Sequence, residues 1–294
     1  MDQHFFTIFI NDIPDGVQSN IKIFADDTKI YNQSVHKNIL QEDLDHLAQW
    51  SDKWLLPFNV EKCKVLHYGR TNQEYQYIMN TKVLPNGSAI KDLGITFQNN
   101  LKFDDHISNI CKTARSRLGV IKYTFQVIDR EGFLILFKSN VRPILEYGTQ
   151  VWFPFLRKHD KELEQIQRRA TIMIHGYKNL SYPERLRKLN LPTLYYRRRR
   201  SDLIQVFRII KKIDDISADS LFDLNLGVTR KNHIYKLNKP RSMTSQKMHS
   251  FSHRTINDWN DLPESVGVID NINSFKSLLE KHWKGVDFKF EFKF

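Results

Sequence analysis

The stretch from residue 21 to residue 31 constrains the fold most, because it predicts a β-hairpin with two adjacent carboxylates at its tip. Ile21 and Ile23 alternate with polar residues before Asp26 and Asp27, and β-branched and aromatic residues follow the two acids. Successive side chains along a strand point to opposite faces, so we expect Asp26 and Asp27 to point to opposite sides. A rigid and exposed Asp pair is the first candidate site.

Hard oxygen ligands of this kind suit Mg²⁺, which usually takes one or two carboxylates and keeps its other positions for water and substrate phosphate. A site for two divalent ions needs carboxylates from at least two strands, so Asp26 and Asp27 cannot build one alone. Asp12 is the nearest other acid, and we expect it to be a helix cap or a surface residue. The alternative is that the Asp pair is an ordinary β-turn without a ligand.

Several segments of the chain resemble one family of polymerases. The Phe-Ala-Asp-Asp-Thr-Lys-Ile sequence resembles the Y/F-x-D-D motif of reverse transcriptases, in the form typical of non-LTR, Jockey-like retrotransposons. The similarity extends over nearly the whole chain in the order found in the family, which makes it specific. The segments that carry it are residues 9–14, 24–30, 58–64, 92–95, 141–148, 166–171 and 252–263.

The resemblance implies an RNA-directed DNA polymerase that joins nucleotides by a two-metal mechanism with Mg²⁺ (or Mn²⁺). It makes Asp26 and Asp27 the catalytic, metal-binding residues, and Phe24 and Lys62 contacts of the incoming nucleotide. A solvent-facing strand lysine is an equally good account of Lys62. The implied partners are an RNA template and a DNA primer.

In that family a further long stretch precedes these motifs, with the fingers and another catalytic Asp, and this sequence does not contain it. We therefore expect the chain to be inactive alone, unless another chain supplies those parts, and to retain binding to primer and template. The alternative function is a non-enzymatic, basic helical module that binds nucleic acid or protein.

The net charge of +12 is unevenly distributed, and its distribution indicates where a polyanion would bind. Residues 1–60 hold 4 Lys and Arg against 9 Asp and Glu, whereas residues 161–212 hold 14 against 4. A basic surface of that density favours nucleic acid by counterion release, although a solvated helix surface gives the same pattern. The candidate nucleic-acid contacts are Arg115, Arg168, Arg169, Arg197, Arg198, Arg199 and Arg200.

The run from Arg197 to Arg200 follows two tyrosines, which suits base stacking combined with phosphate contacts. It also fits a nuclear-localisation-like run, which is a frequent pattern. Four successive residues cover every face of a helix, so some of these arginines must pack back onto the protein.

We expect an α+β fold with four parts. These are a partial palm with the metal-binding hairpin (1–100), a helical thumb with basic helices (101–213), a basic irregular linker (214–250) and a helical tail (251–294). Leucines from residue 40 onward predict an amphipathic helix with Glu42, Asp43 and Asp45 on its outer side. Pro143 should kink or divide a thumb helix, and the palm should leave a sheet edge exposed. Residues 288–294 alternate in a strand pattern.

Cysteine usage and hydropathy exclude several other classes of protein. Cys63 and Cys111 have no Cys or His at ligand spacing, which argues against a disulfide framework and a zinc site. The apolar runs are too short to span a bilayer, and no signal peptide is recognisable. We expect an intracellular protein of the nucleus or the cytoplasm.

Overall fold

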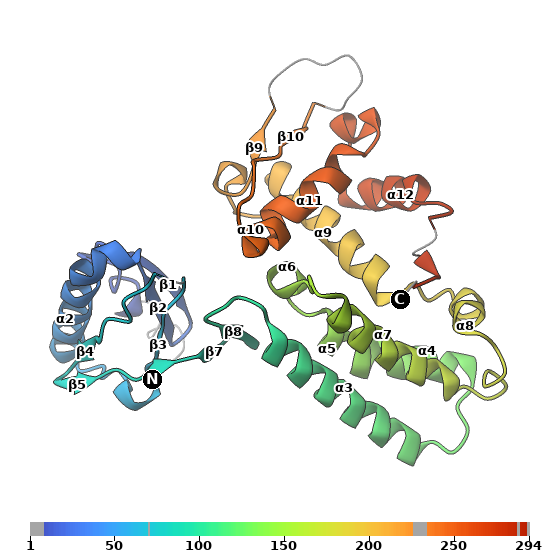
Figure 1. Cartoon of the computed structure of the whole chain (residues 1–294), viewed down its shortest axis with the longest axis horizontal. Helices are drawn as coiled ribbons and strands as arrows, with labels where there is room; N and C mark the ends of the chain where they lie inside the picture. The colour runs from blue at the N-terminus through green and yellow to red at the C-terminus, as the bar shows by residue number, and fades with distance from the viewer. Residues whose placement is uncertain (1–8, 70, 226–233, 287–288, 293–294) are drawn as a thin grey trace. The chain divides into compact units, whose positions relative to one another are not determined.

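The computed structural model describes residues 9–69, 71–225, 234–286 and 289–292. The chain divides into two compact units, Met1–Leu101 (unit 1) and Lys102–Phe294 (unit 2), which are coloured blue to teal and green to red in Figure 1. The elements of unit 1 are β1 (Asn20–Phe24), β2 (Asp27–Tyr31), η1 (Ser34–His36), α2 (Lys37–Trp54), η2 (Val60–Lys62), β3 (Val65–Leu66), β4 (Ile78–Met79), β5 (Lys82–Val83), β6 (Asn86–Gly87), β7 (Ala89–Asp92) and β8 (Ile95–Gln98).

The hairpin predicted from residues 21–31 is present as the antiparallel pair β1 and β2. Its alternating sequence gives it one half-buried face, with Ile21, Ile23 and Ile30 packed against the core of unit 1. Helix α2 supplies the other side of that core through Leu44, Leu47 and Trp50, at the spacing that places them on one helical face. Core packing on one side thus fixes which hairpin face stays in solvent.

Asp43 corrects the prediction for the outer side of α2, because its side chain is buried at 2% exposure. Its two carboxylate oxygens accept hydrogen bonds from the backbone N–H groups of Gln18 and Ser19, each at 2.8 Å. These two donors lie just before β1 and would have no strand partner. Asp43 therefore fixes the start of the hairpin to α2.

The rest of unit 1 consists of short strand pairs rather than one continuous sheet. Strand β3 pairs in parallel with β6, while β4 pairs with β5 and β7 with β8 in antiparallel hairpins. Strands β1 and β2 form a two-stranded sheet. Neither outer edge of that sheet pairs with another strand of the described chain. The exposure of an edge stays a prediction.

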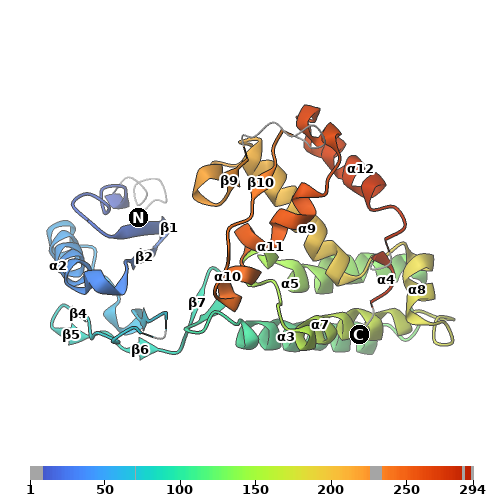
Figure 2. The same cartoon turned by 45° about the horizontal axis from the view of Figure 1, so that its top comes forward.

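Unit 2 is mainly helical. Its elements are α3 (Asp104–Thr124), α4 (Arg130–Leu136), η3 (Phe137–Val141), α5 (Arg142–Glu146), α6 (Thr149–Trp152), α7 (Arg157–Ile172), α8 (Tyr182–Leu189), α9 (Leu194–Ile210), η4 (Ala218–Ser220), β9 (Asp223–Leu224), β10 (Leu237–Asn238), α10 (Ser245–His249), α11 (Phe251–Asn260), η5 (Glu264–Val268) and α12 (Ile272–His282). Figures 1 and 2 both show α3 and α7 packed side by side.

Pro143 divides a helix, as predicted. A π-helical turn, η3, follows α4, and Pro143 then occupies the first turn of α5. A proline is tolerated there because the N–H that it lacks would have no partner within the helix. The wider π-helical turn η3 joins the α-helical segments α4 and α5.

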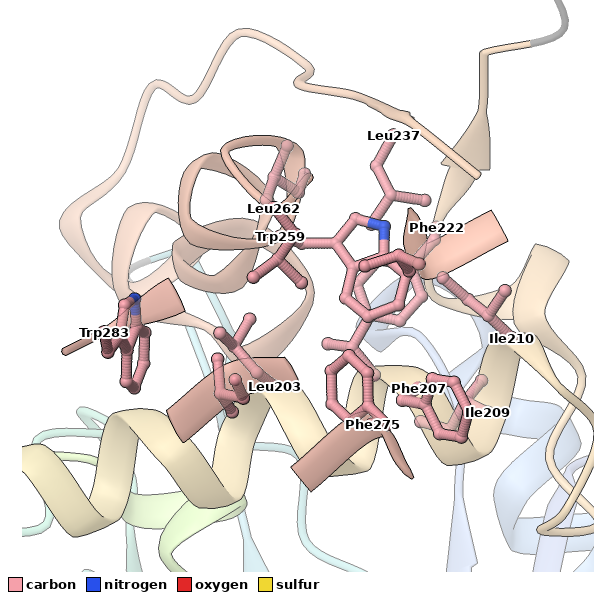
Figure 3. Packing of buried hydrophobic residues seen from close by; sticks show 14 of the residues in the cluster. Leu203, Phe207, Ile209, Ile210, Phe222, Leu237, Trp259, Leu262, Phe275 and Trp283 are labelled. Carbon is pink, nitrogen blue, oxygen red and sulfur yellow. The ribbon is translucent and has the colours of Figure 1, made fainter. Parts of the chain in front are cut away.

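The tail is not a separate part, which corrects the expected division after residue 213. Helices α9, α11 and α12 share one apolar core, in which Phe207 stacks on Phe275 at 4.3 Å between ring centroids (Figure 3). Residues 214–250, predicted as an irregular linker, include η4, β9, β10 and α10, although residues 226–233 lie outside the described chain. Phe222 and Leu237 are buried and anchor this segment.

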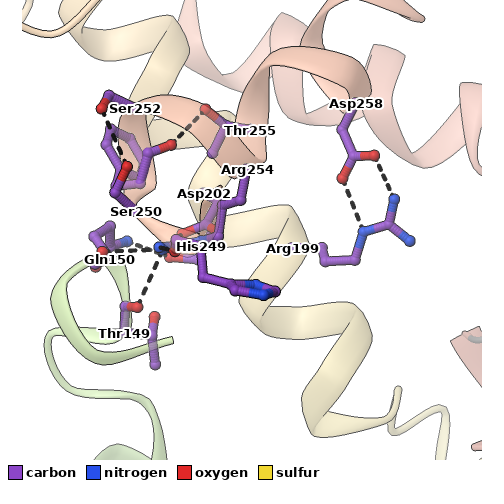
Figure 4. A network of polar contacts seen from close by, with 12 residues as sticks. Thr149, Gln150, Arg199, Asp202, His249, Ser250, Ser252, Arg254, Thr255 and Asp258 are labelled. Atoms are coloured by element: carbon purple, nitrogen blue, oxygen red, sulfur yellow. Dashed lines mark hydrogen bonds and ion pairs between the residues drawn. The ribbon is translucent and has the colours of Figure 1, made fainter. Parts of the chain in front are cut away.

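The 252–263 signature joins the tail to the rest of unit 2. Arg254 donates to both carboxylate oxygens of Asp202 on α9, at 2.9 and 3.1 Å, and to the Gln150 carbonyl on α6 at 2.9 Å (Figure 4). The Asn260 amide accepts from the N–H of Leu237 and donates to its carbonyl. These residues therefore have a structural use within the chain.

The predicted strand at residues 288–294 is absent from the described part of that segment, residues 289–292. Residues 288, 293 and 294 lie outside the described chain. Across the described ranges, none of the helices has the length and apolar character needed to cross a membrane.

Replacing Asp43 with Ala should lower the free energy of unfolding by about 3 kcal/mol, because two backbone donors lose their acceptor in a buried position. Urea denaturation of the full chain measures this loss. Glu42→Ala is the matched control, since Glu42 is exposed on the same helix. An equal effect of both variants would contradict the role given to Asp43.

Candidate functional site

The tip of the β1–β2 hairpin is a two-residue turn formed by Ala25 and Asp26. Phe24 and Asp27 are the last paired residues on either side of it. Ala25 has φ of 53°, and a positive φ at the first central position is a feature of the turns that match the twist of a hairpin. Asp26 thus belongs to the turn and not to a strand, so the strand alternation used in the sequence analysis does not apply to it.

Asp27 lies on the solvent face of the hairpin, together with Phe24, Lys22 and Lys29. Phe24 is 64% exposed, which is unusual for a phenylalanine and leaves its ring available to a ligand. Asp26 and Asp27 are both exposed. Within the described chain, neither carboxylate has a hydrogen bond or an ion pair, so both are available to a cation.

The two carboxylates fit the oxygen chemistry that Mg²⁺ prefers and the small number of protein ligands that it takes. They do not form a complete cage, because the described residues contain no group of three or more potential ligand side chains. Asp12 is used elsewhere, since its carboxylate accepts a hydrogen bond from the Trp50 indole at 2.9 Å. The structure therefore offers one carboxylate pair for a metal.

Lys62 lies in the short helix η2 and is exposed. It is not on the predicted strand, because the run from residue 63 to residue 68 forms a strand only at Val65–Leu66. Among the described residues, no bond or ion pair joins Lys62 to the hairpin. Its assignment to the nucleotide stays a prediction.

Sequence reasoning missed the ion pair between Lys29 and Asp92. Lys29 also lies over the Phe97 ring, 5.8 Å from its centroid. Lys29 belongs to the segment that resembles the metal motif and Asp92 to the segment 92–95, so both segments were visible but their contact was not. Lys29 and Asp92 are 63 positions apart, and no periodic pattern in the sequence indicates a contact over that separation.

The run of four arginines on α9 is occupied by ion pairs within unit 2. Arg197 binds Glu146 of α5, Arg198 binds Asp160 of α7, Arg199 binds Asp258 of α11, and Arg200 binds Glu280 of α12. Figure 4 shows the two bonds of the pair from α9 to α11. The run thus connects one helix to four others.

Arg198 corrects the predicted set of nucleic-acid contacts, because it is 1% exposed and a phosphate cannot reach it. Its guanidinium also lies over the Phe153 ring at 5.6 Å. Burial raises the pKa of its partner Asp160, and the charge of Arg198 opposes that shift. Arg197, Arg199 and Arg200 are half-buried, and their assignment stays a prediction.

The other three arginines predicted to contact nucleic acid differ in their surroundings. Arg115 is exposed and pairs with Glu162 of α7 at 3.0 Å. Arg168 stacks over the Tyr182 ring at 5.0 Å, whereas Arg169 is exposed. The sequence analysis named Arg169 but not Arg157 and Lys161, which a spacing in multiples of four residues could have indicated.

Arg157, Lys161 and Arg169 form an exposed stripe along α7, which we call the α7 basic stripe. Residues four apart lie above one another on a helix, so these three cations follow one side of α7 over about 18 Å. No ion pair joins Arg157 or Arg169 to another described residue. The three cations of the stripe are more exposed than the four arginines of α9.

A buried carboxylate holds α7, α8 and α9 together behind this stripe. Glu164 is fully buried, accepts a hydrogen bond from the Tyr182 hydroxyl at 2.5 Å, and accepts another from the Leu194 N–H at 2.9 Å. Burial raises its pKa to about 7, against the opposing effect of these bonds. Glu164 caps the first turn of the helix that carries the arginines.

The chain is similar to RNA-directed DNA polymerases of mobile elements. It is 29% identical over 191 residues to the RNA-directed DNA polymerase from mobile element jockey of Drosophila melanogaster, a match that covers 58% of this chain and 20% of that protein. The corresponding jockey protein of Drosophila funebris is 24% identical over 187 residues, with the same coverage. The probable polymerase from transposon X-element of Drosophila melanogaster is 25% identical over 170 residues, covering 54% and 18%.

These matches confirm that the chain is related to the Jockey-like polymerases of non-LTR retrotransposons, as the motifs around Asp26 and Asp27 predicted. The matched region spans about one fifth of the length of these curated relatives. No protein-family model matches the chain, and no solved structure matches it.

The raised pKa of Glu164 has a consequence for stability. A carboxyl whose pKa is about 7 in the folded chain and 4.5 in the unfolded chain binds more protons when folded, so stability is lost as pH rises through this window. The free energy of unfolding should fall by about 3 kcal/mol more between pH 5 and pH 8 than it does in Glu164→Gln. Urea denaturation at both pH values measures the difference. Parallel pH profiles for the two proteins would contradict it.

Proposed function

We propose that this chain supplies part of the metal site and the nucleic-acid-binding helices of an RNA-directed DNA polymerase. The observation that carries the proposal is the Asp26–Asp27 pair, which is exposed on a hairpin whose other face is fixed in the core of unit 1. Its motif resembles that of the polymerases to which the chain is related. Unit 1 then corresponds to part of a palm, and unit 2 to a thumb with its C-terminal extension.

Asp26 and Asp27 would hold Mg²⁺ (or Mn²⁺), which in nucleotidyl transfer would activate the primer 3′-hydroxyl and stabilise the leaving pyrophosphate. The core packing of Ile21, Ile23 and Ile30 supports this role, because it limits the movement of the strands that carry the acids. Phe24 shares the solvent face with Asp27, which suits a ring placed against the base or sugar of a nucleotide. Lys62 would supply a cation to the triphosphate.

The proposal makes this hairpin half of a two-metal site. The described residues offer two adjacent carboxylates, and a cage for two ions needs a further carboxylate from another strand. That ligand would come from residues outside the described chain, either in the same longer protein or in another chain. Without it, the chain is expected to bind primer and template but not to extend the primer.

The α7 basic stripe is the surface that we assign to the RNA template and DNA primer. Arg157, Lys161 and Arg169 are exposed along one side of α7, and Arg115 lies on the neighbouring helix α3. Lysine and arginine side chains that replace condensed counterions give binding that is strong at low salt and nearly independent of sequence. The arginines of α9 serve mainly to hold unit 2 together.

The second candidate function is a basic helical module without catalysis, which binds nucleic acid or protein. The incomplete carboxylate set favours it over an autonomous enzyme. It differs from the first proposal in that the Asp pair would have no role in metal binding.

Charge-neutralising variants test the assignment of the surface. Arg157→Gln and Arg169→Gln should each lower the affinity for an RNA–DNA primer–template duplex about threefold at 0.1 M salt, and each should reduce the salt slope by about one. Fluorescence anisotropy across a range of salt concentrations measures both quantities.

Arg200→Gln is the matched control, because it removes the same charge from a residue paired with Glu280. It should weaken folding more than it weakens binding. Equal losses of affinity in all three variants would mean that binding follows net charge alone. A flat salt response would contradict a nucleic-acid role altogether.

Primer extension tests whether the Asp26–Asp27 pair is only half of a two-metal site. The chain alone should incorporate no nucleotide on a primed RNA template with Mg²⁺, because its described carboxylates cannot hold two ions. Incorporation that disappears in Asp26→Ala would show a complete site and overturn this part of the proposal. Glu42→Ala, an exposed acid on α2, is the control for loss of charge.

A further inference from the structure

Lys29 lies close to the Asp pair and on the same face of the hairpin as Asp27. The two residues are two positions apart on β2, and both point to solvent. Residues at this spacing have Cα atoms about 6.6 Å apart, which a lysine side chain can span. A lysine in this position is therefore able to neutralise the carboxylate that a metal ion would need.

A second lysine adds to the positive charge on this face. Lys22 of β1 is directly opposite Lys29 in the hairpin register. Like charges directly opposite each other repel, so this pair favours a position of the Lys29 ammonium beside a carboxylate. Without another acid nearby, Asp27 would be the nearest carboxylate for the Lys29 ammonium.

Asp92 provides that other acid. It forms an ion pair with Lys29, and the Phe97 ring lies beneath the same ammonium. The Asp92 side chain is only 19% exposed, so its charge is less screened than that of a surface carboxylate. Burial and the charge of Asp92 also raise the pKa of Tyr68.

A strained turn holds Asp92 in place. Asp92 is the last paired residue of β7, and Leu93 and Gly94 form the two-residue turn to β8. Both turn residues have positive φ, at 44° and 83°. A leucine in this region costs conformational energy, so the surrounding structure must maintain the turn.

We propose that Asp92 is a positioning residue, which holds Lys29 away from Asp27 and so leaves the Asp27 carboxylate open to a divalent cation. The inference rests on the proposed metal-binding role of the hairpin. Asp92 itself does not touch the metal in this arrangement. Its effect passes through Lys29, so removal of Lys29 should make Asp92 dispensable.

Mn²⁺ binding to the full chain, followed by electron paramagnetic resonance of the free ion, tests the proposal. The hairpin site is defined as the binding that is lost in the Asp26→Asn, Asp27→Asn double variant. Asp92→Asn should weaken this site about fivefold, because the released ammonium competes for Asp27. Asp92→Asn combined with Lys29→Met should return to within about twofold of the unmodified chain.

Two controls separate this mechanism from simpler effects. Asp52→Asn removes the same charge from an exposed position on α2 and should change the affinity less than about twofold. Thermal unfolding of each variant checks that unit 1 remains folded. A purely structural role for Asp92 would not be rescued by Lys29→Met.

The possible outcomes distinguish the proposed metal-binding role of the hairpin from the proposed positioning role of Asp92. Equal Mn²⁺ binding by the unmodified chain and the Asp26→Asn, Asp27→Asn variant would contradict the proposed metal role, and the inference would fall with it. A hairpin site that is present but unchanged by Asp92→Asn would overturn the inference alone. Weakening by Asp92→Asn without rescue by Lys29→Met would overturn it as well.

Discussion

The pairing of α9 arginines with carboxylates is the interaction on which the rest of unit 2 depends. A guanidinium that leaves water must gain a carboxylate and hydrogen bonds, or its burial is strongly unfavourable. Arg198 gains the carboxylate of Asp160 between α9 and α7, although its Nε and Nη1 have no hydrogen-bond partner among the described residues. Asp202 is the buried acid of a pair in the opposite sense, with Arg254 of α11. Charge therefore determines which helices can lie against α9, while the apolar core around Phe207 fills the space between them.

The ion pairs of α9 change how the excess of basic residues should be interpreted. The +10 excess of residues 161–212 suggested one continuous surface for a polyanion, yet the four arginines of α9 have acidic partners inside the protein. What remains exposed in residues 161–212 is a smaller set of cations: Lys161, Arg169, Lys178, Arg187, Lys188 and Lys212. The acids that neutralise the run come from helices before and after it in the chain, so a count over a local window overstates the charge that solvent meets.

Features that depend on neighbours in the sequence could be predicted. The hairpin around Asp26 and Asp27 follows from strand alternation and a short turn, and the division at Pro143 follows from a missing N–H. Features that depend on distant partners could not be predicted. Asp43 looks like any acid on the outer side of α2 until Gln18 and Ser19 are placed beside it, and Lys29 shows no need for Asp92.

The order in which the chain is synthesised gives the α9 pairs a further consequence. Arg199 precedes its partner Asp258 by 59 residues, and Arg200 precedes Glu280 by 80. A ribosome that has just released α9 has not yet made the acids of α11 and α12, so a nascent chain carries both guanidinium groups without these partners. Completion of α11 supplies the partner of Arg199, and only completion of α12 supplies the partner of Arg200.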